Sequence, residues 1–316
     1  MDFAGLLRKG FSKSRARTVL DDAILEMGAY EALWLRPGAT FKTVGGWIAA
    51  EDGRLSALVD KEEAERSAHQ VLREFAGAGV SNARLKLKGE PDFPVKLGDA
   101  RHPLRAFYYR GNLSLLKTPS VAVVGARQLS EQGAARTRRL VRRLVEDGFT
   151  IVSGMAAGTD AVAHATALQM GGRTIAVLGT PIHKVYPRQN AGLQEVIAER
   201  FLVISQVPVL LHDTKDWRYN RKFFPERNIT MSALTDASII VEIGDSRGTY
   251  IQSKAALDQG RPLFLLNNCF RKKGVSWPAQ FARRGAVRAT DYADIGSRLG
   301  HIAKQDEKRC TASDPA

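Results

Sequence analysis

Residues 120–178 read SVAVVGARQLSEQGAARTRRLVRRLVEDGFTIVSGMAAGTDAVAHATALQMGGRTIAVL, and this stretch decides the fold class. It contains three short apolar runs, Val121–Val124, Thr150–Val152 and Thr174–Leu178, separated by two segments of helical periodicity. Apolar β-branched runs without polar alternation are typical of strands buried on both faces, and strands that alternate with helices form right-handed crossovers. The stretch therefore predicts an α/β fold with a doubly wound, mostly parallel sheet.

Small residues follow the first two predicted strands. Gly125 comes after the first, and Ser153, Gly154, Gly158 and Thr159 come after the second. In a doubly wound sheet, ligands collect beyond the carboxyl ends of the strands, where backbone amides at a helix start attract anions. We therefore predict that these residues bind phosphate through their backbone. The dinucleotide fingerprint GxGxxG is absent from the first turn, and a tight turn that only packs helix against strand explains the second loop equally well.

The composition is that of a globular protein with an excess of positive charge. Of its 316 residues 44% are hydrophobic, and 47 Lys and Arg against 33 Asp and Glu give a net charge of +14. Such a charge attracts polyanions, of which nucleic acid is the commonest in a cell. No apolar run could span a membrane and the N-terminus lacks the pattern of a secretion signal, so we expect a cytoplasmic protein without membrane contact.

Neither a disulfide framework nor a metal site is indicated. Cys269 and Cys310 lack CxxC spacing and have no histidine cluster nearby, which favours two free thiols. We expect no metal and no cofactor.

Three segments are predicted along the chain. Residues 1–89 are expected to form a small helical module, with helices over Leu6–Ile24 and Lys61–Ala76. The sequence GEPDFP at residues 89–94 is typical of a linker, and the sheet domain is expected to cover residues 90–300. The polar tail, residues 301–316, is expected to be disordered.

A short segment after the third strand gives the best nucleic-acid signal. Residues 215–228 read KDWRYNRKFFPERN, in which aromatic residues are interleaved with Lys and Arg. Bases stack on aromatic rings while cations follow the phosphates, so this composition suits a single strand. Core packing accounts for some of the rings, and we expect Phe223 or Phe224 to be buried.

Several motifs then occur in a fixed order: YRGNLSLL, SVAVVGAR, SGMAAGTDAVAH, VYPRQN, FPERN and AALDQGRPLF. In this order the chain resembles the DNA-processing protein A (DprA/Smf) family over roughly residues 89–299. The resemblance implies an extended Rossmann-like domain that binds single-stranded DNA and works without catalysis in DNA processing, uptake or recombination. It also implies a homodimer and a RecA-type recombinase as partner.

The resemblance and the charge pattern together give the candidate DNA-binding residues. In the family's FPxRN motif the Arg and Asn lie in the DNA pocket, which here corresponds to Arg227 and Asn228; the family usually continues with a second Arg, whereas this chain has Ile229. Trp217 or Phe224 is expected to stack on bases. The full set of expected DNA contacts is Arg127, Lys184, Arg188, Trp217, Arg221, Lys222, Phe224, Arg227, Asn228 and Arg247.

One turn departs from the family and leaves other functions open. Arg247-Gly248-Thr249 resembles the GGxGTxxE turn of lysine-decarboxylase-like nucleotide enzymes, so Gly248 and Thr249 are expected to bind phosphate through their backbone. The acid of those enzymes corresponds to Gln252, and an amide cannot ionise or take up a proton in glycosidic cleavage. A small-nucleotide sensor or phosphoribohydrolase-like enzyme remains one alternative. The other is a component of a phage-defence or toxin–antitoxin cassette with its own partner protein.

Two helical patterns remain ambiguous. Asp160 and His164 stand four apart at a helix start, and we interpret them as a structural pair, not as acid–base or metal-binding groups. The helix predicted over Ala134–Asp147 has an outer face made of arginines, and a solvated face explains it as well as a phosphate-contacting one. The arginines are Arg136, Arg138, Arg139, Arg142 and Arg143.

Overall fold

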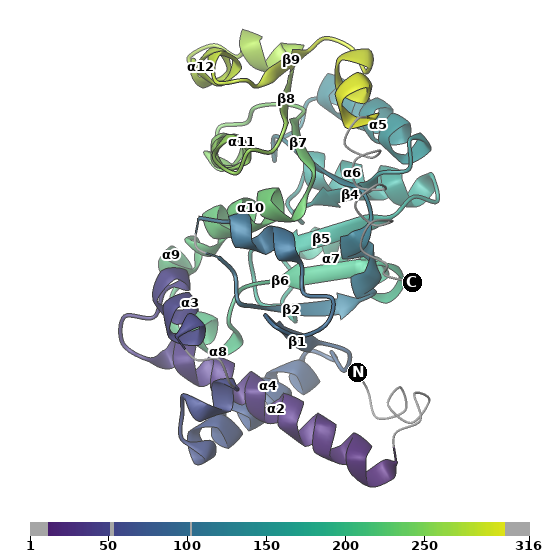
Figure 1. Cartoon of the computed structure of the whole chain (residues 1–316). Coiled ribbons are helices and arrows are strands. Elements are labelled where there is room, and N and C mark those ends of the chain that lie inside the picture. Colours follow the sequence, from purple (N-terminus) through teal and green to yellow (C-terminus); the bar gives the residue numbers. More distant parts are fainter. Residues whose placement is uncertain (1–11, 51–53, 102, 301–316) are drawn as a thin grey trace, which may run out of the picture.

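The computed structural model describes residues 12–50, 54–101 and 103–300 (Figure 1). Its centre is a nine-stranded sheet in the order β1-β2-β6-β5-β4-β3-β7-β8-β9. β2 pairs antiparallel with β1 and β6, and all other neighbours run parallel. The strands are β1 (Arg84–Leu87), β2 (Ala106–Gly111), β3 (Ser120–Val124), β4 (Thr150–Ser153), β5 (Thr174–Leu178), β6 (Leu202–Ser205), β7 (Ala237–Ile240), β8 (Leu263–Leu266) and β9 (Val287–Ala289). The expected α/β fold with a mostly parallel sheet is confirmed.

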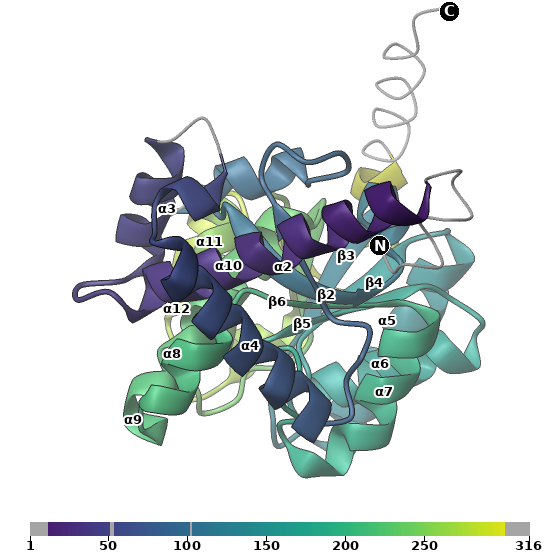
Figure 2. The same cartoon turned by 90° about the horizontal axis from the view of Figure 1, so that it is seen from below.

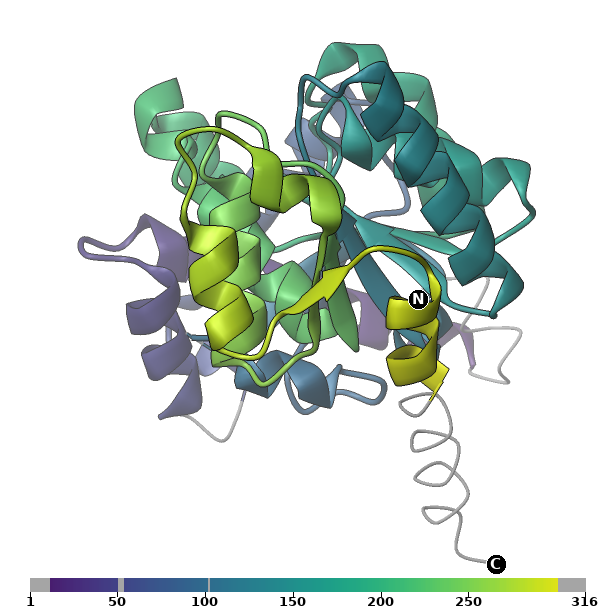
Figure 3. The same cartoon turned by 90° about the horizontal axis from the view of Figure 1, so that it is seen from above.

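Helices cover both faces of the sheet (Figure 3). α5, α6 and α7 pack on one face, while α10 and α11 pack on the other. The α-helices are α2 (Lys13–Leu35), α3 (Phe41–Ala49), α4 (Lys61–Gly77), α5 (Glu131–Glu146), α6 (Thr159–Gln169), α7 (Ala191–Arg200), α8 (Val209–Thr214), α9 (Trp217–Asn220), α10 (Phe223–Leu234), α11 (Gly248–Asp258) and α12 (Trp277–Arg283). The 3-10 helices are η1 (Leu55–Ala57), η2 (Val95–Asp99), η3 (Leu113–Lys117), η4 (Arg188–Asn190) and η5 (Asn267–Arg271), and residues 293–300 are also helical.

The central elements form as their residue patterns indicate. Every residue of β3 and β5 is buried, as expected for strands covered on both faces. α5 begins a little earlier than predicted because the Ser130 hydroxyl accepts a hydrogen bond from the Gly133 amide and caps the helix. Its side chains Leu140, Val141 and Leu144 are buried, so its arginines point away from the sheet.

The N-terminal helices are joined to the sheet by a buried acid. Glu31 on α2 is fully buried and accepts hydrogen bonds from the Tyr108 hydroxyl on β2, at 2.7 Å, and from the amides of Val209 and Leu210 at the start of α8. Burial raises the pKa of Glu31 to about 7, although these hydrogen bonds act in the opposite direction. Since a buried carboxylate is costly without partners, this contact fixes how α2 lies under the sheet (Figure 2).

The predicted segment boundaries remain predictions, but several expectations can be located. β1 lies inside residues 1–89 and already pairs with the sheet. The predicted Leu6–Ile24 helix lies partly outside the described residues, and α2 continues past Ile24 to Leu35. The expected disorder of residues 301–316 also falls outside them. No helix within the described ranges is long and apolar enough to cross a membrane.

The order of the strands creates one favoured ligand position. The chain places β4, β5 and β6 on one side of β3, then returns to place β7, β8 and β9 on the other side. The strand order therefore reverses next to β3. Crossovers diverge at such a switch point and leave a crevice beyond the carboxyl ends of the strands, where ligands bind in open α/β sheets.

Candidate functional site

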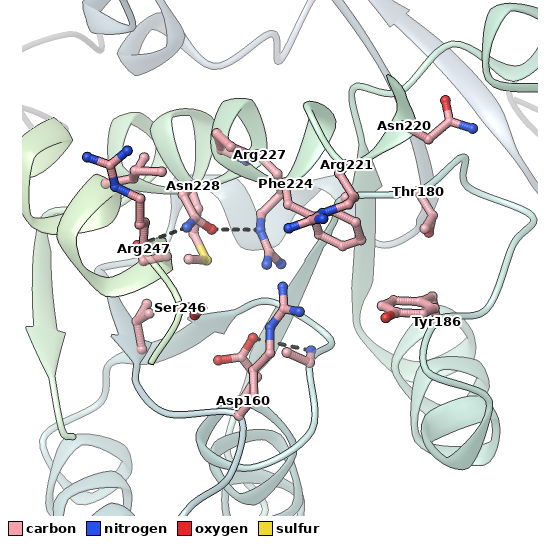
Figure 4. A pocket seen from close by; sticks show the side chains of 18 of the residues that line it. Asp160, Thr180, Tyr186, Asn220, Arg221, Phe224, Arg227, Asn228, Ser246 and Arg247 are labelled. Atoms are coloured by element: carbon pink, nitrogen blue, oxygen red, sulfur yellow. Dashed lines mark hydrogen bonds between the residues drawn. The ribbon is translucent and has the colours of Figure 1, made fainter. Parts of the chain in front are cut away.

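A cavity of about 1050 Å³ lies at this switch point (Figure 4). The loops after β3 and β5, together with α9, α10 and the start of α11, form its walls. Most of the expected DNA-binding side chains line it, namely Arg127, Lys184, Trp217, Arg221, Phe224, Arg227, Asn228 and Arg247. Arg188 and Lys222 are not among the lining residues. Of the residues expected to bind phosphate through the backbone, Gly125, Gly248 and Thr249 line the cavity, whereas Ser153, Gly154, Gly158 and Thr159 do not.

Three arginines at the cavity are exposed and form no salt bridge among the described residues, although Asp160 attracts Arg127 from a distance. Arg127, Arg221 and Arg247 come from three segments far apart in the sequence. None of them forms a salt bridge within the part of the chain that the structure describes. Lys184 differs, because its ammonium is bonded to the Asp213 carboxylate. The three arginines therefore give the cavity mouth a positive potential that can attract an anion.

Aromatic rings stand beside these cations. The Arg221 guanidinium carbon lies 5.5 Å from the centre of the Trp217 ring, and Trp217 is 63% exposed. On the other side, Arg127 lies 5.6 Å from the centre of the Phe224 ring, which is itself 5.7 Å from the ring of Tyr186. The expected burial of one phenylalanine is confirmed, because the neighbouring Phe223 is in the core. Tyr186 also lines the cavity, which the VYPRQN motif that contains it does not by itself indicate.

Arg227 and Asn228 line the cavity but mainly hold its walls together. Arg227 is 6% exposed, and its Nη1 donates to the Val177 carbonyl at 2.6 Å while its Nε donates to the Asn228 Oδ1 at 2.9 Å. Asn228 in turn donates to the Gly248 carbonyl at 3.1 Å. These bonds tie α10 to the end of β5 and to the start of α11. The expected contact of Arg227 and Asn228 with DNA remains a prediction.

Asp160 is the buried acid that faces Arg227. A Cβ added to Gly154 would lie 1.9 Å from Arg227 Nη1 and 2.5 Å from Asp160 Oδ2, so only glycine allows the two groups to approach each other here. Burial raises the pKa of Asp160 and lowers that of Arg227, and the attraction between the two opposes both shifts. The pair is therefore held at the cavity floor at a cost in desolvation.

Asp160 and His164 were expected to pair with each other, and this prediction is wrong because each bonds to other groups. Asp160 Oδ2 accepts a hydrogen bond from the Ala156 amide at 3.3 Å. The His164 ring is fully buried between the Thr174 hydroxyl and the Gly154 carbonyl, each at 2.7 Å. Burial lowers the pKa of His164 to about 4, so the ring is neutral at pH 7. Spacing of four placed both groups on one helix face, but the loop after β4 supplied each with a closer partner.

The glycine loop after β4 packs against the loop after β3. Gly158 has φ of 78°, a conformation that favours glycine, and a Cβ on it would meet the Ala126 carbonyl at 2.3 Å. The Thr159 amide, expected to bind phosphate, instead donates to the same carbonyl at 3.1 Å. This loop therefore matches the alternative of a tight packing turn.

The arginine face of α5 lies apart from the cavity. Arg136 is held by Glu242 at 2.8 Å, and Arg143 lies 5.2 Å from the ring of Tyr292. The exposed Arg138, Arg139 and Arg142 line a separate shallow groove. Arg136 is thus a structural residue, and both explanations stay open for the exposed members of this face.

A model of the DNA recombination-mediator protein A family matches residues 84–300. The chain belongs to this family. Protein Smf of Synechocystis is 39% identical over 191 residues, which cover 59% of this chain and 46% of that protein. DNA processing protein DprA of Streptococcus pneumoniae is 39% identical over 179 residues, covering 55% and 59%. Protein Smf of Borreliella burgdorferi is 32% identical over 254 residues, covering 80% and 73%. The match to the first two relatives spans about half of their length.

Solved structures of family members share the fold. The X-ray structure of DNA processing protein A from Streptococcus pneumoniae superposes with a TM-score of 0.61 at 24% identity, over 91% of this chain and 98% of that one. The structure of DNA processing protein A from Helicobacter pylori, reported with its single-stranded DNA binding mode, superposes with a TM-score of 0.55 at 24% identity. The match covers 70% of this chain and 96% of that one. At this identity the likeness supports the fold alone.

Gln252 is not among the residues that line the cavity of this family member. It is fully buried on α11, and its Nε2 donates to the Ser238 hydroxyl at 2.9 Å. The side chain that corresponds to the acid of the nucleotide enzymes is therefore an amide that faces β7. Neither its chemistry nor its position suits general acid–base work.

Proposed function

We propose that this chain binds single-stranded DNA in the cavity at the switch point and acts without catalysis in DNA processing, uptake or recombination. One observation carries the proposal: exposed arginines that form no salt bridge among the described residues and exposed aromatic rings converge from separate segments on a single cavity. Arg221 beside Trp217 and Arg127 beside Phe224 each combine a cation for a phosphate with a ring for a base. This combination is typical of proteins that follow a single strand.

The geometry favours an unpaired strand over a duplex. Trp217 and Tyr186 present their rings at the cavity, and a ring can stack on a base only where the base has left its own stack. A duplex offers its phosphates to the arginines but hides the faces of its bases. The Helicobacter pylori relative with a described single-stranded DNA binding mode supports the same choice.

We propose that the chain is not an enzyme, and the acids at the cavity support this proposal. Asp160 and Asp245 are the carboxylates among its lining residues. Asp160 is buried against Arg227, and Asp245 is an exposed residue that pairs with Lys272 at 3.2 Å. Gln252 cannot replace them. Because Gly248 and Thr249 do line the cavity, a small-nucleotide enzyme or sensor stays as the second candidate, and a turnover assay separates the two.

The proposal is tested by fluorescence anisotropy with a labelled oligonucleotide, single-stranded and annealed to its complement. We expect tighter binding of the single strand and a strong dependence on salt, because bound cations release counterions. If about three or four phosphates are contacted, a fourfold rise in salt should weaken affinity about 20- to 50-fold. Equal affinity for both forms, or an affinity independent of salt, would refute the proposal.

We also propose a partner, an assembly and a location that suit this function. A recombination mediator acts on the protein that carries out strand exchange, so we propose a RecA-type recombinase as partner, a homodimer as assembly and the cytoplasm as location. Pull-down with a purified recombinase and light scattering of the purified chain test the first two. If the neighbouring genes encode defence or toxin proteins, a cassette role with its own partner replaces the recombinase.

A further inference from the structure

Three potential metal ligands meet where the N-terminal helices contact the sheet domain. Glu74 lies on α4, His183 in the loop after β5, and Asp213 on α8. One ligand atom of each lies within 4.8 Å of the other two. The residues are far apart in the sequence, yet α4 and α8 lie side by side in the fold (Figure 2). The cluster is therefore built by tertiary packing, and the ring of Phe75 supports it from 5.6 Å away from the His183 ring.

His183 is the unusual member of this cluster. It is only 9% exposed, and both of its ring nitrogens are buried without a hydrogen-bond partner in the part of the chain that the structure describes. A buried polar group without a partner costs roughly 1–3 kcal/mol. Because the histidine faces two carboxylates, a cation placed between them would give the ring nitrogen the partner that it lacks.

We propose that Glu74, His183 and Asp213 bind one Zn²⁺ ion. An imidazole nitrogen with two carboxylate oxygens is a ligand set that Zn²⁺ accepts in tetrahedral geometry, with a water in the fourth position. Mg²⁺ and Ca²⁺ prefer oxygen ligands only, so they suit this site less well. Ligand atoms around tetrahedral Zn²⁺ lie about 3.4 Å apart, so the three groups must close by roughly 1 Å. Glu74 and Asp213 are partly exposed and can move by this amount.

Lys184 is the group that competes with the metal. Its ammonium is bonded to Asp213, and the His212 Nδ1 lies 3.4 Å from the same carboxylate. The described bonds of the Lys184 ammonium involve Asp213 and His212, so His183 stays without a partner. Zn²⁺ would displace the ammonium from Asp213. Lys184 also lines the large cavity, so on the proposed function the displaced cation becomes free to contact DNA phosphate.

The test is calorimetric titration of Zn²⁺ into the full-length chain. The protein carries no affinity tag, Cys310 is replaced by Ser so that its thiol does not bind the metal, and bound metal is first removed by a chelator. We expect one Zn²⁺ per chain and a higher unfolding temperature in its presence. His183→Gln and Asp213→Asn should each weaken binding at least tenfold. His69→Gln is the matched control, because His69 is an exposed histidine on the same helix α4.

The outcomes separate this site from adventitious binding and from the proposed function. No measurable Zn²⁺ binding, or binding that His183→Gln and Asp213→Asn leave unchanged, overturns the proposal. Asp213→Asn alters a partly exposed side chain and is expected to keep the fold, so it remains informative if His183→Gln unfolds. The titration contains no DNA, so failure to bind oligonucleotides leaves its result intact. Conversely, anisotropy measured without added Zn²⁺ tests the proposed function whether or not the metal binds.

Discussion

Replacing Arg227 by alanine is expected to lower the free energy of unfolding by about 3–5 kcal/mol, the cost of leaving a buried charge unpaired. A Cβ on Gly154 would lie 1.9 Å from Arg227 Nη1 and 2.5 Å from Asp160 Oδ2. The two charged atoms are therefore at most 4.4 Å apart, the sum of these distances. At an effective dielectric constant of about 20, charges at this separation attract by about 4 kcal/mol. The variant also leaves the Val177 carbonyl without its donor.

The defect should depend on pH. Burial raises the pKa of Asp160 and Arg227 lowers it, so the variant has a still higher pKa at this carboxyl. A carboxyl with a raised pKa binds more protons in the folded than in the unfolded state, so its contribution to stability falls as pH rises. The stability difference between wild type and Arg227→Ala should therefore be larger at pH 8 than at pH 5.

Urea unfolding followed by circular dichroism measures these effects. Arg221→Ala is the matched control, because it removes the same charge from an exposed position and should change stability by less than about 0.5 kcal/mol. Arg227→Met combined with Asp160→Asn should recover part of the loss, since no unpaired charge then stays buried. If Arg227→Ala unfolds like the wild type while DNA binding falls, the buried-pair reasoning is refuted and Arg227 acts chiefly as a phosphate contact.

Three further predictions follow from the site and the fold. Arg221→Ala and Trp217→Ala should each weaken single-stranded DNA binding by about 1–3 kcal/mol. Arg200→Ala is the control and should not, because Arg200 lies beside the Phe201 ring, at 5.8 Å, before β6. An equal loss of DNA affinity in all three variants would contradict the site. The wild type should lose stability as pH rises from 4.5 towards 7, because the raised pKa of Glu31 favours the folded state at low pH, and Glu31→Gln should reduce this loss. Urea unfolding midpoints measured from pH 5 to 8 test this, and an unchanged slope in the variant would contradict it. Chromatography should detect no base released from AMP, cytokinin-type nucleotides or NAD, and turnover that disappears in Thr249→Ala would instead establish the nucleotide enzyme.

The sequence by itself determined the central sheet, the amphipathic α5 and the family. β3, β4 and β5 lie where the apolar runs predicted them, because a strand buried on both faces needs a continuous apolar run whatever surrounds it. The ordered motifs, from YRGNLSLL at Tyr109 onward, were enough to identify the family that the family model matches over residues 84–300. In both cases the signal lies in residues adjacent in the chain.

Only the tertiary structure decided which side chains of the aromatic and basic segment face the cavity. Phe223 is buried in the core, whereas its neighbour Phe224 lies at the cavity and Arg221 is exposed there. Arg227, one helical turn after Phe223 on α10, lines the cavity but is buried. Helical periodicity shows which residues share a face, but not whether that face meets the sheet, a cavity or solvent. That choice depends on β5, the Gly154 loop and the start of α11, which reach Arg227 and Asn228 from distant parts of the chain.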